Sequence, residues 1–342
     1  MKQGLKNNDM LCKNRQRIDY VDISKGVGLI LVVLSHTVAY ELMKFASGFY
    51  VPIFFVCAGY TYRKSENFHE IVKKRMVKLM KPYFFFNILL LICFMHFSLR
   101  DFVGLLYSRY CLYLPEVVPN IKFLTSGNYP LWFLTCMSVS YILFYILVFN
   151  ERFCAYIILF YLVLTGILDK LPILLPWSID TAFIMAILMY VGKYLKEKGI
   201  IVSDCRVYLY SRFLFFLLLY VFAMLFEGEM NISIRIYGRS FLLYLLTAIF
   251  GCVMLLYFSI IIEKSYAGRL FLLLGNHSLT IFCIEIPFVY YSGMCFDMLF
   301  DQGSLRYYIL IKGIFQLFVA IVGGYACSLF FNRFSAVRKL IT

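Results

Sequence analysis

Residues 17–36 read R-I-D-Y-V-D-I-S-K-G-V-G-L-I-L-V-V-L-S-H, a charged opening followed by a long apolar run. Apolar runs of roughly twenty residues recur along the whole chain, and this is the length that a helix needs to cross a ~30 Å hydrocarbon core. Because unpaired backbone groups are costly in lipid, such runs form helices or a closed barrel. Barrel strands alternate apolar and polar residues, which these runs do not. The sequence therefore predicts an all-α integral membrane protein.

The composition supports this prediction and indicates which kinds of partner the chain has. Of the 342 residues, 62% are hydrophobic and only 15% are charged, too few for the surface of a soluble protein of this length. A net charge of +14 could indicate a nucleic-acid-binding face, but the charges lie between apolar runs. We therefore expect membrane lipid around the chain and no nucleic acid partner. The composition makes no prediction of the oligomeric state.

The cysteines and histidines do not form a metal-binding pattern. The eleven cysteines include no C-x-x-C pair, and the four histidines are far apart in the sequence. Zinc and redox motifs need close ligand spacing. We therefore expect neither a metal site nor a bound cofactor.

The apolar pattern predicts ten transmembrane helices in a single domain that covers residues 1–342. Their approximate limits are 22–43, 47–62, 82–99, 130–149, 153–169, 177–195, 207–226, 240–262, 269–291 and 306–331. The first span lacks an A-x-A cleavage site and leads into another span, so we interpret it as a retained helix and not a signal peptide. With the N-terminus inside, cytoplasmic segments hold 23 of the 33 Lys and Arg residues, as the positive-inside rule requires. Both termini are therefore expected in the cytoplasm.

Two connecting segments differ from the other loops. Residues 63–81, RKSENFHEIVKKRMVKLMK, are strongly basic and are expected to form an amphipathic cytoplasmic helix, either on the inner leaflet or around a ligand. Residues 100–129 form the longest predicted outer loop.

Three ionisable residues of the first span fall near one line on a helix. Asp22 and Lys25 share a face, and Lys25 and His36 differ by only ~20° around the axis and ~16 Å along it. This places His36 about halfway through the bilayer, where an ionisable side chain should face a polar cavity. A neutral imidazole there could act as a general base for a hydroxyl. Alternatively, His36 only bonds a neighbouring helix, and Asp22 and Lys25 form an ordinary interfacial ion pair.

The same stretch resembles the opening signature of the acyltransferase 3 family, R-x-x-x-x-D-I-x-K-G-x-x-L-I-L-V-V-L-x-H. It is most similar to the branch of fucose-4-O-acetylase-like and polysaccharide O-acetyltransferase proteins. Four further motifs follow in the family's order, so that the resemblance covers nearly the whole chain. They are the second-span motif at Phe49–Tyr60, the basic entry to the third span at Arg75–Asn87, the WFL motif at Leu131–Leu134 and the late G-x-x-S-L-x-I-Y motif at Leu274–Phe282.

The resemblance implies a membrane O-acyltransferase in the bacterial plasma membrane. Its donor would be cytoplasmic acetyl-CoA or another acyl-CoA such as succinyl-CoA. The acceptor would be a sugar hydroxyl of a surface polysaccharide or a lipid-linked glycan. Two other functions remain open: a glycan transporter or flippase, and a catalytically inactive member that acts as an assembly subunit. We find no convincing inverted repeat of the kind that favours a transporter.

The resemblance also assigns roles on the donor side and to the first span. His36 would deprotonate the acceptor hydroxyl or carry the acyl group as a covalent intermediate. Asp22 would orient a neighbouring cation. The groups expected to hold the phosphates of the donor are Arg17, Lys25, Arg75 and Lys78, although positive-inside anchoring alone would also place Arg75 and Lys78 in the cytoplasm.

Two residues depart from the family pattern, and three others are assigned to substrate binding. Tyr50 and Glu285 stand where this branch commonly has histidines. Glu285 could accept a proton, or it could be a protonated carboxyl bonded to a neighbouring helix. Trp132 could pack on a sugar ring, although tryptophan is also common at membrane interfaces. Tyr50 and the late-motif residues Asn276 and Ser278 are likewise expected to contact substrate.

Overall fold

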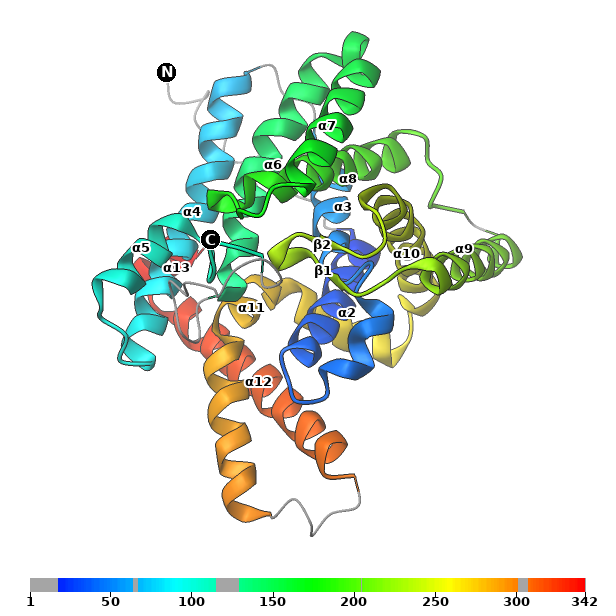
Figure 1. Ribbon diagram of the computed structural model, residues 1–342. Coiled ribbons are helices and arrows are strands. Elements are labelled where there is room, and N and C mark those ends of the chain that lie inside the picture. Colours follow the sequence, from blue (N-terminus) through cyan, green and yellow to red (C-terminus); the bar gives the residue numbers. More distant parts are fainter. Residues whose placement is uncertain (1–17, 64–66, 115–128, 204, 301–306, 342) are drawn as a thin grey trace, which may run out of the picture.

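The computed structural model of the protein describes residues 18–63, 67–114, 129–203, 205–300 and 307–341. Within these ranges the chain is almost entirely helical (Figure 1), which confirms the all-α prediction. The α-helices are α2 (Asp19–Ser35), α3 (Pro52–Tyr60), α4 (Phe68–Cys93), α5 (Leu99–Tyr107), α6 (Trp132–Phe149), α7 (Cys154–Asp169), α8 (Ile179–Glu197), α9 (Arg206–Phe226), α10 (Phe241–Ile262), α11 (Tyr266–Leu299), α12 (Tyr308–Arg333) and α13 (Ser335–Ile341).

Short 3₁₀ turns and one small hairpin complete the described fold. The turns are η1 (Tyr40–Ala46), η2 (Tyr129–Leu131), η3 (Glu151–Phe153), η4 (Pro176–Ser178) and η5 (Ile232–Ile234). The hairpin pairs β1 (Met230–Asn231) with β2 (Ile236–Tyr237) in antiparallel register.

The described residues contain 8 helices that are long and apolar enough to cross a membrane. They are α4 and α6–α12, and they correspond to the third to tenth predicted spans. The other two predicted spans, 22–43 and 47–62, contain the 17-residue helix α2 and the 9-residue helix α3. The total of ten spans and the cytoplasmic position of the termini therefore stay predictions.

Side-chain hydroxyl groups help to end α2 earlier than expected. The Ser35 hydroxyl donates to the carbonyl of Val32 at 2.7 Å, and the Thr37 hydroxyl donates to that of Leu34 at 2.8 Å. Such local bonds compete with the helical ladder for the same carbonyls. The chain then continues through η1 to α3. As a result, His36 lies at the end of a helix and not in the middle of the predicted 22–43 span.

Helix α4 joins two segments that the sequence analysis treats as separate. It runs without interruption from within the basic stretch 63–81 into the third predicted span, with Pro82 inside it. The predicted outer loop 100–129 also carries structure, because most of helix α5 lies in it. Its residues 115–128 lie outside the described part of the chain.

The helices separate into an inner group and a peripheral group. The apolar residues of α6, α8, α10 and α11 are mostly buried, whereas α7, α9 and α12 leave most of theirs exposed. In Figure 1, α2 and α3 lie within the bundle and α9 lies at its edge. An exposed apolar surface of this extent fits a helix that faces lipid.

Two glycines bring α2 and α11 close together. A Cβ atom at Gly26 would lie 2.0 Å from the carbonyl oxygen of Phe271, and one at Gly275 would lie 1.8 Å from that of Asp22. Only residues without a side chain permit so close an approach of two helices. The contact lies ten residues before His36 on α2 and ten before Glu285 on α11, or about 15 Å along each helix. It therefore sets how the two ionisable residues meet.

We expect Gly275→Ala to destabilise the protein by roughly 1–3 kcal/mol, because the new methyl group would force the two backbones apart. Thermal unfolding in detergent would measure the loss. Gly166→Ala on α7 is the matched control, since its Cβ would meet only the ring of Phe241 at 3.3 Å and alanine favours a helix over glycine. Equal stability of the two variants would contradict the close contact.

Candidate functional site

A direct hydrogen bond joins His36 at the end of α2 to Glu285 in the middle of α11. Nδ1 of His36 lies 2.7 Å from Oε1 of Glu285. The carboxylate is fully buried, whereas the imidazole is 20% exposed. Oε2 of Glu285 is buried and has no hydrogen-bond partner among the described residues. The structure therefore brings two of the predicted catalytic residues together as one pair.

The turn that carries His36 is fastened to the neighbouring helices by Gln316 of α12. Its side-chain oxygen accepts a hydrogen bond from the N–H of Val38 at 3.1 Å, and its amide nitrogen donates to the carbonyl of Val289 on α11 at 2.9 Å. Gln316 is 4% exposed. It thus couples the main chain after His36 to the helix that carries Glu285, a role that the sequence analysis missed.

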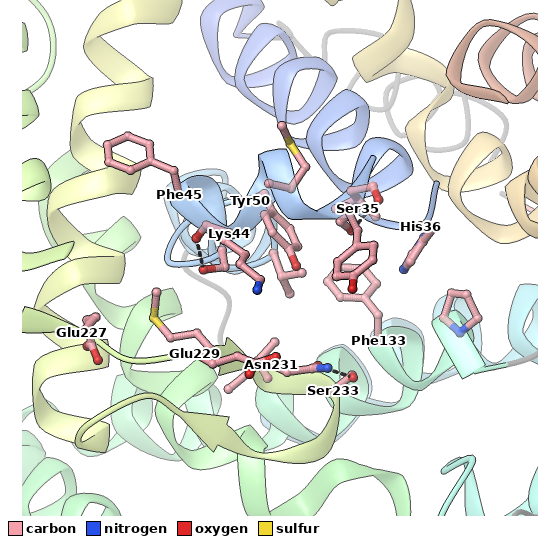
Figure 2. Close-up of a pocket in the computed structure, with 18 of the residues that line it drawn as sticks. Ser35, His36, Lys44, Phe45, Tyr50, Phe133, Glu227, Glu229, Asn231 and Ser233 are labelled. Carbon is pink, nitrogen blue, oxygen red and sulfur yellow. Dashed lines mark hydrogen bonds between the residues drawn. The ribbon is translucent and has the colours of Figure 1, made fainter. Parts of the chain in front are cut away.

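A cavity of about 1010 Å³ lies beside His36. It is enclosed by the turn after α2, the start of α6 and the segment 224–233 that leads from α9 into the hairpin. Figure 2 shows His36 at one end and Glu227 at the other, with Asn231 and Ser233 along one side. The volume is at the upper limit of small-molecule sites. We call it the His36 cavity.

The four residues predicted to bind substrate divide into two groups. Tyr50 and Trp132 both line the His36 cavity, and Trp132 is 7% exposed. Asn276 and Ser278 lie on α11, about two turns of helix or more before Glu285, and do not line this cavity.

The described residues predicted on the donor side do not line the cavity. Nζ of Lys25 is 3.0 Å from Oδ1 of Asp22, so this pair forms on one face of α2 as expected. The guanidinium of Arg75 on α4 lies 5.4 Å from the ring centroid of Tyr141 on α6. Two further predicted residues are Lys78, which is exposed on α4, and Arg17, which lies outside the described residues.

A buried ion cluster stabilises the wall of the cavity that lies opposite the turn after α2. Asp180, at the start of α8, accepts hydrogen bonds from Arg109 through Oδ1 and from Arg235 through Oδ2, the latter at 3.0 Å. All three side chains are at most 3% exposed. Further guanidinium N–H groups donate to main-chain carbonyls of the surrounding segments, those of Leu171, Ile173, Leu175 and Ser233, whereas Nε of Arg235 has no hydrogen-bond partner among the described residues.

This arginine–aspartate cluster (Arg109, Asp180 and Arg235) fixes the position of the hairpin. Arg235 belongs to the hairpin turn, and Arg109 bonds the carbonyl of Ser233, which lines the cavity. Buried charges are tolerated when they are paired, and here both arginines share the carboxylate of Asp180. Both arginines fall between the predicted spans. In the sequence, each arginine is a charged residue among mostly apolar neighbours. This marks it as unusual but does not identify Asp180 as its partner.

The pair formed by His36 and Glu285 can perform general-base chemistry. An ionised Glu285 carboxylate can only accept a hydrogen bond, so at 2.7 Å it would keep the imidazole proton on Nδ1 and leave Nε2 as the basic nitrogen. The same carboxylate stabilises the imidazolium that forms when Nε2 takes a proton. Among the described residues, no group of three or more His, Cys, Asp or Glu side chains could hold a metal ion.

A family model described as an acyltransferase domain matches residues 18–333, a range that includes His36, Glu285 and the arginine–aspartate cluster. No curated protein and no solved structure matches the chain.

Proposed function

We propose that this chain, which belongs to the acyltransferase 3 family of membrane acyltransferases, moves an acyl group from cytoplasmic acyl-CoA to a sugar hydroxyl. The family assignment and the apolar helices make it a multi-pass membrane protein. Within the proposal, the donor is acetyl-CoA, with succinyl-CoA as the alternative. The acceptor is a surface polysaccharide or a lipid-linked glycan, and the membrane is a bacterial plasma membrane.

The observation that carries the proposal is the hydrogen bond between His36 and Glu285 beside the cavity. Glu285 stands where a histidine is common in the resembling branch, and this departure makes an inactive member a plausible alternative. Its contact with His36 instead supports an active site, because a buried carboxylate is a suitable partner for a catalytic imidazole. Glu285 acts through His36 and is therefore a positioning residue.

In the proposed reaction, Nε2 of His36 takes the proton of the acceptor hydroxyl while its oxygen attacks the thioester carbonyl. The carbon–sulfur bond then breaks, and the thiolate of CoA leaves with the proton from the imidazolium. In the relay alternative, Nε2 itself attacks the thioester and the thiolate of CoA leaves as the carbon–sulfur bond breaks. The acceptor hydroxyl then attacks the acyl-imidazole, Nε2 is released, and the hydroxyl proton passes to the thiolate. Both routes use Glu285 to hold Nδ1–H and to stabilise positive charge on the ring.

On the donor side, Lys25 and Arg75 support the proposal by their surroundings. Lys25 lies at the predicted cytoplasmic end of α2, ~16 Å from His36 along the helix, so the thioester arm of the donor would extend along α2. Arg75 packs on Tyr141, and in the described part of the chain no salt bridge joins it to a carboxylate. A guanidinium in this state keeps its capacity for a phosphate group.

The proposal is tested by incubating membranes that contain the chain with radiolabelled acetyl-CoA. We expect label in the glycan fraction, and none in membranes from cells without the chain. Label from succinyl-CoA alone would change the donor and leave the reaction class intact. Glycan export without label from either donor would contradict acyl transfer and support a transporter.

A further inference from the structure

The wall of the His36 cavity carries an excess of negative charge. Among the described lining residues, the carboxylates are Glu227 and Glu229 and the single cation is Lys44. Nζ of Lys44 lies 2.7 Å from Oε2 of Glu41, so its charge is already paired. The cavity is therefore acidic, although the chain as a whole has a net charge of +14.

Glu227 is held in place at the end of the cavity away from His36 (Figure 2). Its Oε2 accepts a hydrogen bond from the N–H of Arg239 at 3.1 Å. Its Oε1 is buried and lacks a hydrogen-bond partner of normal geometry among the described residues. Burial raises the pKa of this carboxyl, and the Arg239 N–H opposes the rise. Glu227 is thus a carboxyl group held in a fixed position at this end of the cavity.

The other walls suit the apolar faces of sugar rings. Tyr50, Tyr110, Trp132 and Phe133 line the cavity. Aromatic side chains combine a flat apolar surface with an occasional polar edge, which matches a ring whose hydroxyls point outward. A volume of about 1010 Å³ exceeds what one such ring would need.

We propose that the acceptor is an uncharged glycan segment of more than one ring, and that Glu227 and Glu229 exclude glycans with carboxylate, sulfate or phosphate groups near the acylated sugar. The inference rests on the proposed function and narrows its acceptor class. The reacting hydroxyl lies at His36, and the neighbouring rings extend along the aromatic side chains toward Glu227. An anionic ring in that position would face the carboxylates of Glu227 and Glu229. The single cation of the described lining, Lys44, is already paired with Glu41. Like charges close to one another disfavour binding.

The test uses purified protein in detergent, radiolabelled acetyl-CoA, and hexose oligosaccharides of two to four rings. Each oligosaccharide is paired with a counterpart that carries one carboxylate at C6. We expect the wild type to prefer the neutral member at least tenfold in kcat/KM. The double variant Glu227→Gln, Glu229→Gln should lose most of this preference by accepting the carboxylated member. Asp297→Asn, a carboxylate on α11 outside the cavity, is the control and should keep the preference.

Binding is followed separately through Trp132, which lines the cavity, in a Trp177→Phe background that removes the other of the two tryptophans. A fluorescence change with the neutral oligosaccharide and a weaker one with its carboxylated counterpart support the inference. Equal or stronger binding and acylation of the carboxylated member would overturn it and leave acyl transfer intact. If no oligosaccharide of either kind binds or takes up label, the proposed function itself fails.

Discussion

Glu285→Gln is expected to lower kcat for acyl transfer by on the order of 10²–10⁴-fold, with little change in the KM of either substrate. Glutamine keeps the shape of the side chain but carries no charge. It therefore cannot stabilise the imidazolium of His36, and it no longer fixes the proton on Nδ1. Glu285→Asp, which restores the charge at a shorter reach, should recover part of the activity.

A double-mutant comparison separates this role from a structural one. If Glu285 acts through His36, adding Glu285→Gln to His36→Ala should cost nothing further, because residues that act as a unit are not additive. Asp297→Asn serves as the control on the same helix, since Asp297 lies near the C-terminal end of α11 and pairs with Lys312 of α12. An additive loss in the double variant would contradict the coupling.

Asp180→Asn is expected to destabilise the protein by roughly 3–5 kcal/mol, as measured by thermal or denaturant unfolding in detergent. The change would leave Arg109 and Arg235 buried without a counter-ion. A loss of this size is a large part of the stability of a typical domain. The segments around the hairpin should lose protection from hydrogen exchange first, because the cluster joins them.

Two further variants test the electrostatic origin of this loss. Adding Arg235→Met to Asp180→Asn removes one of the stranded charges and should restore part of the stability. Glu197→Gln is the control, because Glu197 is 54% exposed and Lys193 keeps its second partner, Glu151. Exposed pairs of this kind contribute about 0–1 kcal/mol. Equal losses in Asp180→Asn and Glu197→Gln would contradict the cluster's role.

The sequence identified His36 and Glu285 separately but not their contact. Each is an ionisable residue in an apolar run, which makes it a functional candidate by itself. Their contact depends on the angle and register at which α2 and α11 cross. The close approach at Gly26 and Gly275 sets this angle and register. The periodicity of one helix does not show which other helix packs against it, and His36 and Glu285 are 249 residues apart in the sequence.

Apolar periodicity predicted the long helices well and the first two spans poorly. Hydropathy extends smoothly past Ser35 and Thr37, so it does not register hydroxyl groups that bond their own backbone and help to end α2. It also separated the basic stretch 63–81 from the following span, because it scores polarity and not helix continuity. The structure carries α4 through both segments.

The wall of the cavity was the part least accessible to sequence reasoning. The arginine–aspartate cluster joins residues from three separate segments, and in the sequence each of them reads as an ordinary loop or helix-start charge. Gln316 likewise reads as one polar residue in an apolar helix. Burial and hydrogen bonding give these residues their roles, and both depend on the assembled fold.

The most direct test compares wild type with His36→Ala in membranes supplied with radiolabelled acetyl-CoA, with equal amounts of folded protein verified for each. The account predicts that label enters the glycan fraction only with the wild type, because Nε2 of His36 must take the hydroxyl proton or carry the acyl group. Undiminished label with His36→Ala would contradict the assignment of His36 as the catalytic residue.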